Sequence, residues 1–175
     1  MWLATGLVDR LALLATPWHD AYAGSAVLPT AVLFAHFAAL LVGGGLALAA
    51  DRATLRAAAR AADDRARQLV ALGETHRVVV GALAVLFASG GLLFLADVET
   101  FATSRVFWVK GALVALLLAN GLAMTRTERA LHAAADADAD ATAIDARWRR
   151  LRRGAMLSVA LWLSTVLAGT VLTNA

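Results

Sequence analysis

The 175-residue chain contains no cysteine, two prolines and one tyrosine. The absence of cysteine excludes disulfides, thiolate metal sites, c-type haem attachment and cysteine-ligated iron–sulfur clusters. Both prolines, Pro17 and Pro29, lie near the start, so the later hydrophobic segments lack the proline breaks and multiple charges that often mark transporters. A small transporter or channel is therefore a weaker interpretation than the two developed below.

Apolar sequence is what the chain has in excess. Hydrophobic residues make up 61% of it, whereas soluble domains average about 45–50%. A helix crosses a bilayer with about 20 apolar residues, and four segments qualify, at about 27–49, 77–97, 105–125 and 154–173. We expect an all-α fold, a four-helix transmembrane bundle that forms one integral membrane domain over residues 1–175.

The residues before the first span are expected to form a further helix. Residues 2–16 read as an N-terminal amphipathic helix that lies on the outer membrane surface, which Pro17 should end or bend. The start lacks a basic stretch, and Asp9 and Arg10 interrupt its apolar run, so it does not read as a signal peptide.

Arginine is distributed unequally between the two sides of the predicted bundle. Four spans place both termini on one side, and residues 51–77 and 125–153 on the other. That second side carries Arg52, Arg56, Arg60, Arg65, Arg67, Arg77, Arg126, Arg129, Arg147, Arg149, Arg150, Arg152 and Arg153. Because Lys and Arg favour the cytoplasmic side, we expect cytoplasmic arginine-rich loops, with the N- and C-termini outside. Basic residues placed beside apolar runs indicate topology, so membrane lipids are expected partners and nucleic acid is not.

Residues near the expected interfaces support this orientation. Trp2, Trp18, Trp108 and Trp148 fall where an aromatic belt would lie. Segment 51–77 is alanine-rich and expected to be helical, and Asp145 should lie near the start of a helix that continues into the fourth span. Arg52, Arg56 and Arg60 recur every four residues as one basic stripe, which either contacts anionic lipid or is a solvated face that serves topology.

Small residues recur within every span. They permit close helix packing in a membrane, but they would equally make room for a flat ligand. The small residues in question are Gly43, Gly44, Gly45, Ser89, Gly90, Gly91, Gly111, Ala115, Gly121, Ser158, Ser164 and Gly169.

Two ionisable residues lie inside the spans, and such residues are functional-site hypotheses by default. With a rise of about 1.5 Å per residue, His36 would lie about 12 Å below the outer surface and Lys110 about 6–9 Å below it. His36 is either a hydrogen-bonded core histidine, a ligand of haem or a metal ion, or a proton relay. Lys110 either extends its stem to the outer interface or pairs with Asp97, Glu99 or an anionic ligand such as a haem propionate.

Other polar residues gather at the same outer end. Asp97 and Glu99 follow the second span and form a predicted outer-side polar cluster. His19 lies on the outer side and would be a second ligand if it folded down onto the site. His76 lies at the opposite end of the second span, too far from His36 to oppose it across one haem.

Three segments carry a resemblance to known proteins: AHFAALLVGGGLALAADRATLRA, ETHRVVVGALAVLFASGGLLFLADVETF and VFWVKGALVALLLANG. Together they resemble a loose group of small bacterial membrane proteins. The group includes the copper-resistance D family, the haem-binding bacterial protoporphyrinogen oxidase and uncharacterised predicted membrane proteins. The shared residues are a first-span His (His36), a Ser-Gly pair (Ser89 and Gly90) and a W-x-K motif (Trp108 and Lys110). The resemblance implies the bacterial cytoplasmic (inner) membrane, haem binding by His36 and a role in activity for Lys110.

These observations give two hypotheses of function. The first is a small cytoplasmic-membrane protein that binds b-type haem, or a metal ion, in the outer half of the bundle. His36 would be the axial ligand, and Lys110 would neutralise a propionate or an anionic substrate. Its role would be electron transfer or oxidation of a membrane-soluble molecule, with a redox partner. The second is a non-catalytic accessory subunit of a larger membrane complex, without a cofactor.

Overall fold

The computed structural model describes residues 2–136 and 140–172, and the side chains of 6–134 and 140–172. Every element in these ranges is a helix, so the predicted all-α fold is confirmed. The helices are α1 (Trp2–Ala23), α2 (Val27–Ala57), α3 (Ala62–Ala96), α4 (Val98–Thr103), α5 (Arg105–Asp136) and α6 (Ala141–Leu172).

Four of these helices, α2, α3, α5 and α6, are long and apolar enough to cross a membrane. Each corresponds to one predicted span, although residue 97 lies one residue past the end of α3; residue 173, the predicted end of the last span, lies outside the described residues. Large side chains such as Phe34 and Leu41 are mostly exposed on the bundle surface, where lipid would cover them. The chain is therefore a multi-pass α-helical membrane protein.

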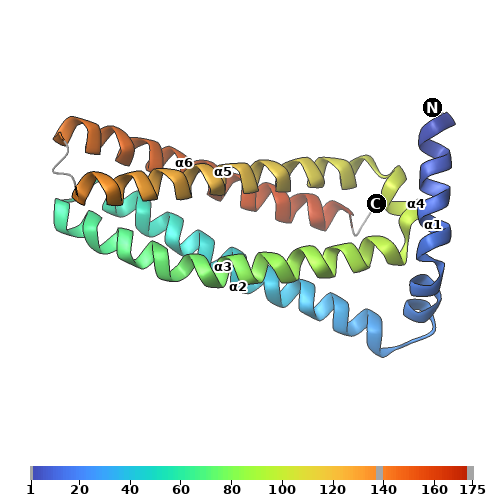
Figure 1. Ribbon diagram of the computed structural model, residues 1–175. Helices are drawn as coiled ribbons and strands as arrows, with labels where there is room; N and C mark the ends of the chain where they lie inside the picture. The colour runs from blue at the N-terminus through green and yellow to red at the C-terminus, as the bar shows by residue number, and fades with distance from the viewer. Residues whose placement is uncertain (1, 137–139, 173–175) are drawn as a thin grey trace.

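The long helices form two antiparallel hairpins, α2–α3 and α5–α6, which are joined mainly through α2 and α6. Figure 1 shows the hairpins close together at one end and diverging toward the other, where α1 and α4 lie. We call the first the arginine-rich end, because it holds residues 51–77 and 126–153. We call the second the terminal end, because α1 and the last residues of α6 lie there.

The predicted helix over 51–77 is wrong at one place. The chain leaves the helical path after Ala57, and α3 starts at Ala62. Asp63 and Asp64 in the first turn of α3 favour a helix start there, because carboxylates stabilise the positive end of the helix dipole. The basic stripe is shorter as a result: Arg52 and Arg56 are exposed on α2, whereas Arg60 lies beyond it and pairs with Asp64 at 3.9 Å.

Some of the small residues make the close contacts that were expected. A Cβ on Gly43 would lie 2.8 Å from that of Ala82 on α3, and a Cβ on Gly44 would lie 3.3 Å from the Trp162 ring on α6. The first span therefore packs against both neighbours through adjacent glycines. The expectation is wrong for Gly45, Gly91, Gly111 and Gly121. These positions are exposed, and a Cβ added at any of them would meet no neighbouring atom within 4 Å.

Helix α1 runs across the terminal end of the bundle and does not follow the direction of the long helices (Figure 1). Leu7, Leu13 and Leu14 are exposed on it, as suits a helix that lies on a membrane surface. Of the two effects predicted for Pro17, an end or a bend, the end is not realised, because α1 continues through Pro17 to Ala23. Trp18 helps to hold this last part: its Nε1–H donates to the Leu92 carbonyl on α3 at 2.9 Å.

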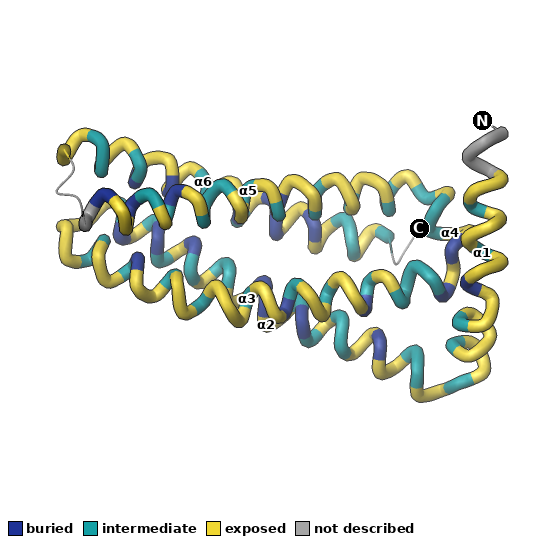
Figure 2. The backbone as a smooth tube through the Cα atoms, viewed as in Figure 1, coloured by how far each residue is buried: buried dark blue, intermediate teal, exposed yellow. Residues whose placement is uncertain are grey.

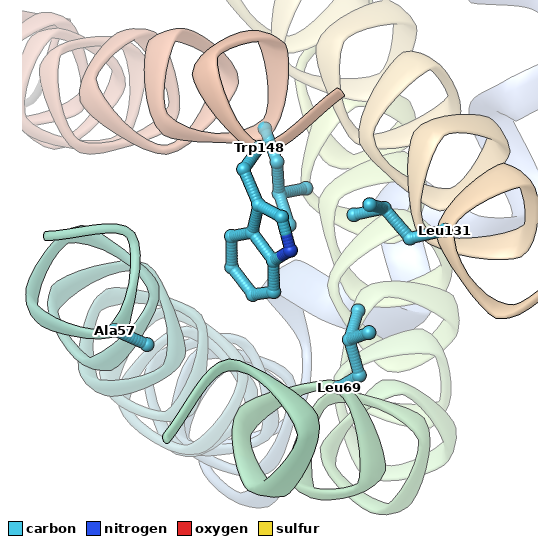
Figure 3. Close-up of a cluster of buried hydrophobic side chains, with 5 residues drawn as sticks. Ala57, Leu69, Leu131 and Trp148 are labelled. Atoms are coloured by element: carbon cyan, nitrogen blue, oxygen red, sulfur yellow. The ribbon is translucent and has the colours of Figure 1, made fainter. Parts of the chain in front are cut away.

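The arginine-rich end has its own hydrophobic core (Figure 3). Trp148, only 3% exposed, packs there with Ala57, Leu69, Leu131 and Leu151. Figure 2 shows buried positions on the facing sides of the helices at this end. The placement of Trp148 in an interfacial belt is therefore wrong: its ring lies inside the bundle, because four helices converge around it.

Arg65 of α3 links the helices around this core. Its Nη1 contacts the Asp145 carboxylate of α6 at 2.6 Å, and its Nη2 donates to the Ala58 carbonyl at 3.0 Å. Its guanidinium lies 5.6 Å from the centre of the Trp148 ring, within cation–π range. The expectation for Asp145 is confirmed, since α6 starts four residues before it.

Candidate functional site

His36 of α2 faces α3 in the half of the bundle near the terminal end. Its Nδ1 lies 3.0 Å from the Ser89 Oγ. The Ser89 hydroxyl donates its own hydrogen to the Val85 carbonyl at 2.7 Å, so it can only accept from the imidazole. Nδ1 therefore carries the hydrogen, and Nε2 keeps its lone pair. A lone pair on a held imidazole suits a ligand or a proton acceptor.

A glycine makes room for this ring. A Cβ on Gly90 would lie 3.4 Å from His36 Cε1, tighter than most contacts of that kind. Ser89 and Gly90 thus act on the same imidazole, one as a hydrogen-bond acceptor and the other by leaving space. The Ser-Gly pair identified in the sequence is part of the His36 environment.

Lys110 of α5 lies across from His36, on the other hairpin. Its ammonium is close enough to the imidazole for an electrostatic interaction, whereas the depth of the two residues in a bilayer stays a prediction. The lysine is half-buried and crosses to α6, where Nζ lies 3.4 Å from the Cβ position of Gly169. In the described part of the chain, no ion pair joins Lys110 to Asp97 or Glu99, so that alternative for Lys110 is not realised.

Asp97 and Glu99 lie beside a cavity next to α1 and do not pair with Lys110 among the described residues. With Asp9, Thr16 and His19 they line a cavity of about 540 Å³ between α1 and the α3–α4 junction. Asp97 also caps α4, since its carboxylate accepts from the Thr100 N–H at 3.1 Å. Asp97 and Glu99 therefore line one cavity at the terminal end, with His19 beside them, and their placement on the outer side stays a prediction.

His19 is engaged with α3. Its Nδ1 lies 2.6 Å from the Ala96 carbonyl, which is in the last turn of α3 and has no partner further along the helix. A carbonyl only accepts, so His19 donates through Nδ1 and holds α1 against α3. Among the described residues, no hydrogen bond or ring contact joins His19 to His36, and the structure does not bring them together as a ligand pair.

Removing the His19 side chain is expected to loosen α1 alone. A His19→Ala variant loses the bond to Ala96, worth about 1 kcal/mol, so the amides of α1 should exchange hydrogen about fivefold faster. Thr16→Ala is the control, because the Thr16 hydroxyl bonds only within α1. Unchanged exchange in α1, or equal acceleration in all helices, would contradict this role.

Asp51 is a buried polar residue that the sequence reasoning missed. It lies near the end of α2 and is only 5% exposed. Its carboxylate lies near Ser158 of α6, and its Oδ2 has no hydrogen-bond partner among the described atoms. Thr54, one turn further, is fully buried and accepts from Gln68 Nε2 of α3 at 3.1 Å. The available signal was an acidic residue directly after an apolar span, with a threonine on the same face. This polar group holds α2, α3 and α6 together at the arginine-rich end.

Comparison of the chain with models of protein families, with curated proteins and with solved structures gives no match. The resemblance to the copper-resistance D family and to the haem-binding oxidase stays a prediction. The class of protein is therefore set by the fold, and the hypothesis of function depends on the side chains around His36.

Proposed function

We propose that the protein is a small cytoplasmic-membrane protein that binds b-type haem between its two hairpins, in the half of the bundle near the terminal end. His36 would be the single axial ligand. The observation that carries the proposal is the hydrogen bond from His36 Nδ1 to Ser89, which leaves Nε2 as the ligating atom. Haem-ligating histidines are commonly oriented in this way through their second nitrogen.

The surrounding residues fit such a group. Gly90 and Gly169 leave space beside His36 and Lys110, where other residues would place a Cβ. The ammonium of Lys110, on the opposite hairpin, would pair with a propionate, a favourable contact in a low-dielectric setting. His19 is occupied with the end of α3, so we expect one protein ligand to the iron and an open second position.

Haem is favoured over a bare metal ion by the number of available ligands. In residues 6–134 and 140–172, no group of three or more His, Asp or Glu side chains is arranged to hold an ion. The porphyrin supplies four nitrogens itself, so one histidine is sufficient.

When bound, the haem would supply electron transfer or the oxidation of a membrane-soluble molecule, with a redox partner as acceptor. Ser89 would fix the tautomer of the His36 imidazole, and Lys110 would pair with a propionate of the haem. The arginine-rich end supports a cytoplasmic location for that end by the positive-inside rule. The haem would then lie toward the outer face of a bacterial inner membrane.

The second candidate is a non-catalytic accessory subunit of a larger membrane complex. The bond between His36 and Ser89 supports it as well, because this bond ties α2 to α3 without any ligand.

Haemin titration of protein purified from haem-deficient cells tests the proposal. We expect a Soret band that saturates near one haemin per chain. For Lys110→Gln we expect an affinity for haemin about tenfold lower, because a charge-assisted contact contributes about 1–3 kcal/mol to the binding free energy. Arg105→Gln removes the same charge from an exposed position of α5 and should leave the affinity unchanged. Titration without saturation, or equal loss in both variants, would favour the accessory subunit.

A further inference from the structure

A basic groove lies between α5 and α6 at the arginine-rich end, far from His36. Its cavity measures about 250 Å³ and is lined by Ala123, Arg126, Thr127, Ala130, Arg147 and Arg150. Arg126 comes from α5, while Arg147 and Arg150 lie one turn apart on one face of α6. Three guanidinium groups from two helices therefore surround a floor made of two alanines and a threonine.

These arginines are not neutralised by the protein. Within the described residues none of the three takes part in an ion pair, and the Nη1 atom of Arg147 is buried without a hydrogen-bond partner. The nearby acid on α6, Asp145, is held by Arg65 of α3. On α5, the charges that act on Glu128 are those of His132, His76 and Arg129 rather than those of the groove. A buried guanidinium nitrogen without a partner favours an anion in the groove.

The surface next to the groove is apolar. Leu122 lies one turn from Arg126 on the same face of α5, and Leu157 lies two turns from Arg150 on the same face of α6. Their side chains are 61% and 50% exposed, and both are on the side of the groove toward the middle of the bundle. The cationic groove is thus continuous with a face suited to hydrocarbon. A ligand with an anionic head and apolar chains would match a cationic groove that lies next to an apolar face.

We propose that this groove binds the phosphate of an anionic phospholipid from the leaflet at the arginine-rich end. Guanidinium groups bind phosphate oxygens in a bidentate geometry, which suits arginine better than lysine. The acyl chains would lie along the faces that carry Leu122 and Leu157. This site is distinct from the basic stripe of Arg52 and Arg56 on α2, and it does not depend on haem binding.

The test is native mass spectrometry of the full chain in neutral detergent, titrated with phosphatidylglycerol or phosphatidylcholine of matched acyl chains. We expect one phosphatidylglycerol to be retained about tenfold more tightly than phosphatidylcholine. The double variant Arg147→Gln/Arg150→Gln should lose about tenfold in phosphatidylglycerol affinity. Arg149→Gln/Arg152→Gln removes the same charge from exposed positions of α6 outside the groove and should have little effect.

Three results would overturn the proposal: equal affinity for the two lipids, equal loss in both double variants, or displacement of the lipid by millimolar inorganic phosphate that itself stays bound. The last would identify a site for free phosphate. If the glutamine variant does not fold, Arg147→Lys/Arg150→Lys keeps the positive charge but removes the planar guanidinium groups that bind phosphate in a bidentate geometry. A several-fold loss in that variant supports the proposal, and an unchanged affinity counts against it.

Discussion

Replacing His36 with alanine is expected to give a folded but colourless protein. His36 is the only histidine on the inner faces of the hairpins at this depth among the described residues, so no other imidazole can take its place. The space left by Gly90 would remain, but without a nitrogen donor in it. We expect retained haem to fall from near one per chain to a few per cent, as measured by pyridine extraction after purification from haem-replete cells.

Two further variants make this result specific. His132→Ala removes an exposed histidine of α5 at the arginine-rich end and should leave haem content unchanged. Ser89→Ala keeps the ligand but removes the acceptor that fixes its tautomer, so affinity should fall by about 10–100-fold, as for other partners of ligating histidines. If pigment persists in His36→Ala, the ligand assignment is wrong.

Truncation of Trp148 to alanine is expected to cause the largest loss of stability. The ring is 3% exposed, belongs to the core at the arginine-rich end and lies beside the Arg65 guanidinium. Its removal leaves a cavity where four helices meet, which typically costs about 3–5 kcal/mol. Equilibrium unfolding in detergent, followed by circular dichroism, measures this difference.

Trp108→Ala is the matched control for this experiment. Trp108 is 63% exposed, and its indole Nε1–H donates to the Ala102 carbonyl. Its loss should cost about 1 kcal/mol or less. A comparable effect from the two tryptophans would contradict the role of Trp148 as a core residue of the arginine-rich end.

The four spans could be predicted from the sequence, whereas the depths of His36 and Lys110 in a bilayer stay predictions. Hydropathy locates the four spans, because a bilayer demands long apolar runs and both hydropathy and length are local properties. The rise per residue then places His36 and Lys110 at similar depth. The structure brings them within electrostatic range, with Ser89 and Gly90 beside the imidazole.

Helix ends and helix faces were harder to predict. The α2–α3 turn lies in an alanine-rich segment that lacks glycine and proline, so only the packing of the hairpin decides where it reverses. Glycine composition likewise does not distinguish Gly43, which contacts Ala82, from Gly111, which contacts nothing. The sequence predicts an interfacial position for Trp148 and gives no prediction for Asp51, whereas helices that continue past the spans enclose both side chains.

The central claim is that the protein holds one haem on His36, and an absorption spectrum tests it most directly. The protein should be purified in detergent from haem-replete cells and measured air-oxidised, then after dithionite, with carbon monoxide added last. We predict a near-stoichiometric Soret band, a five-coordinate reduced spectrum and a clear shift with carbon monoxide, because one protein ligand leaves a position open. A colourless protein would contradict the claim, and an unshifted six-coordinate spectrum would contradict the single-ligand arrangement.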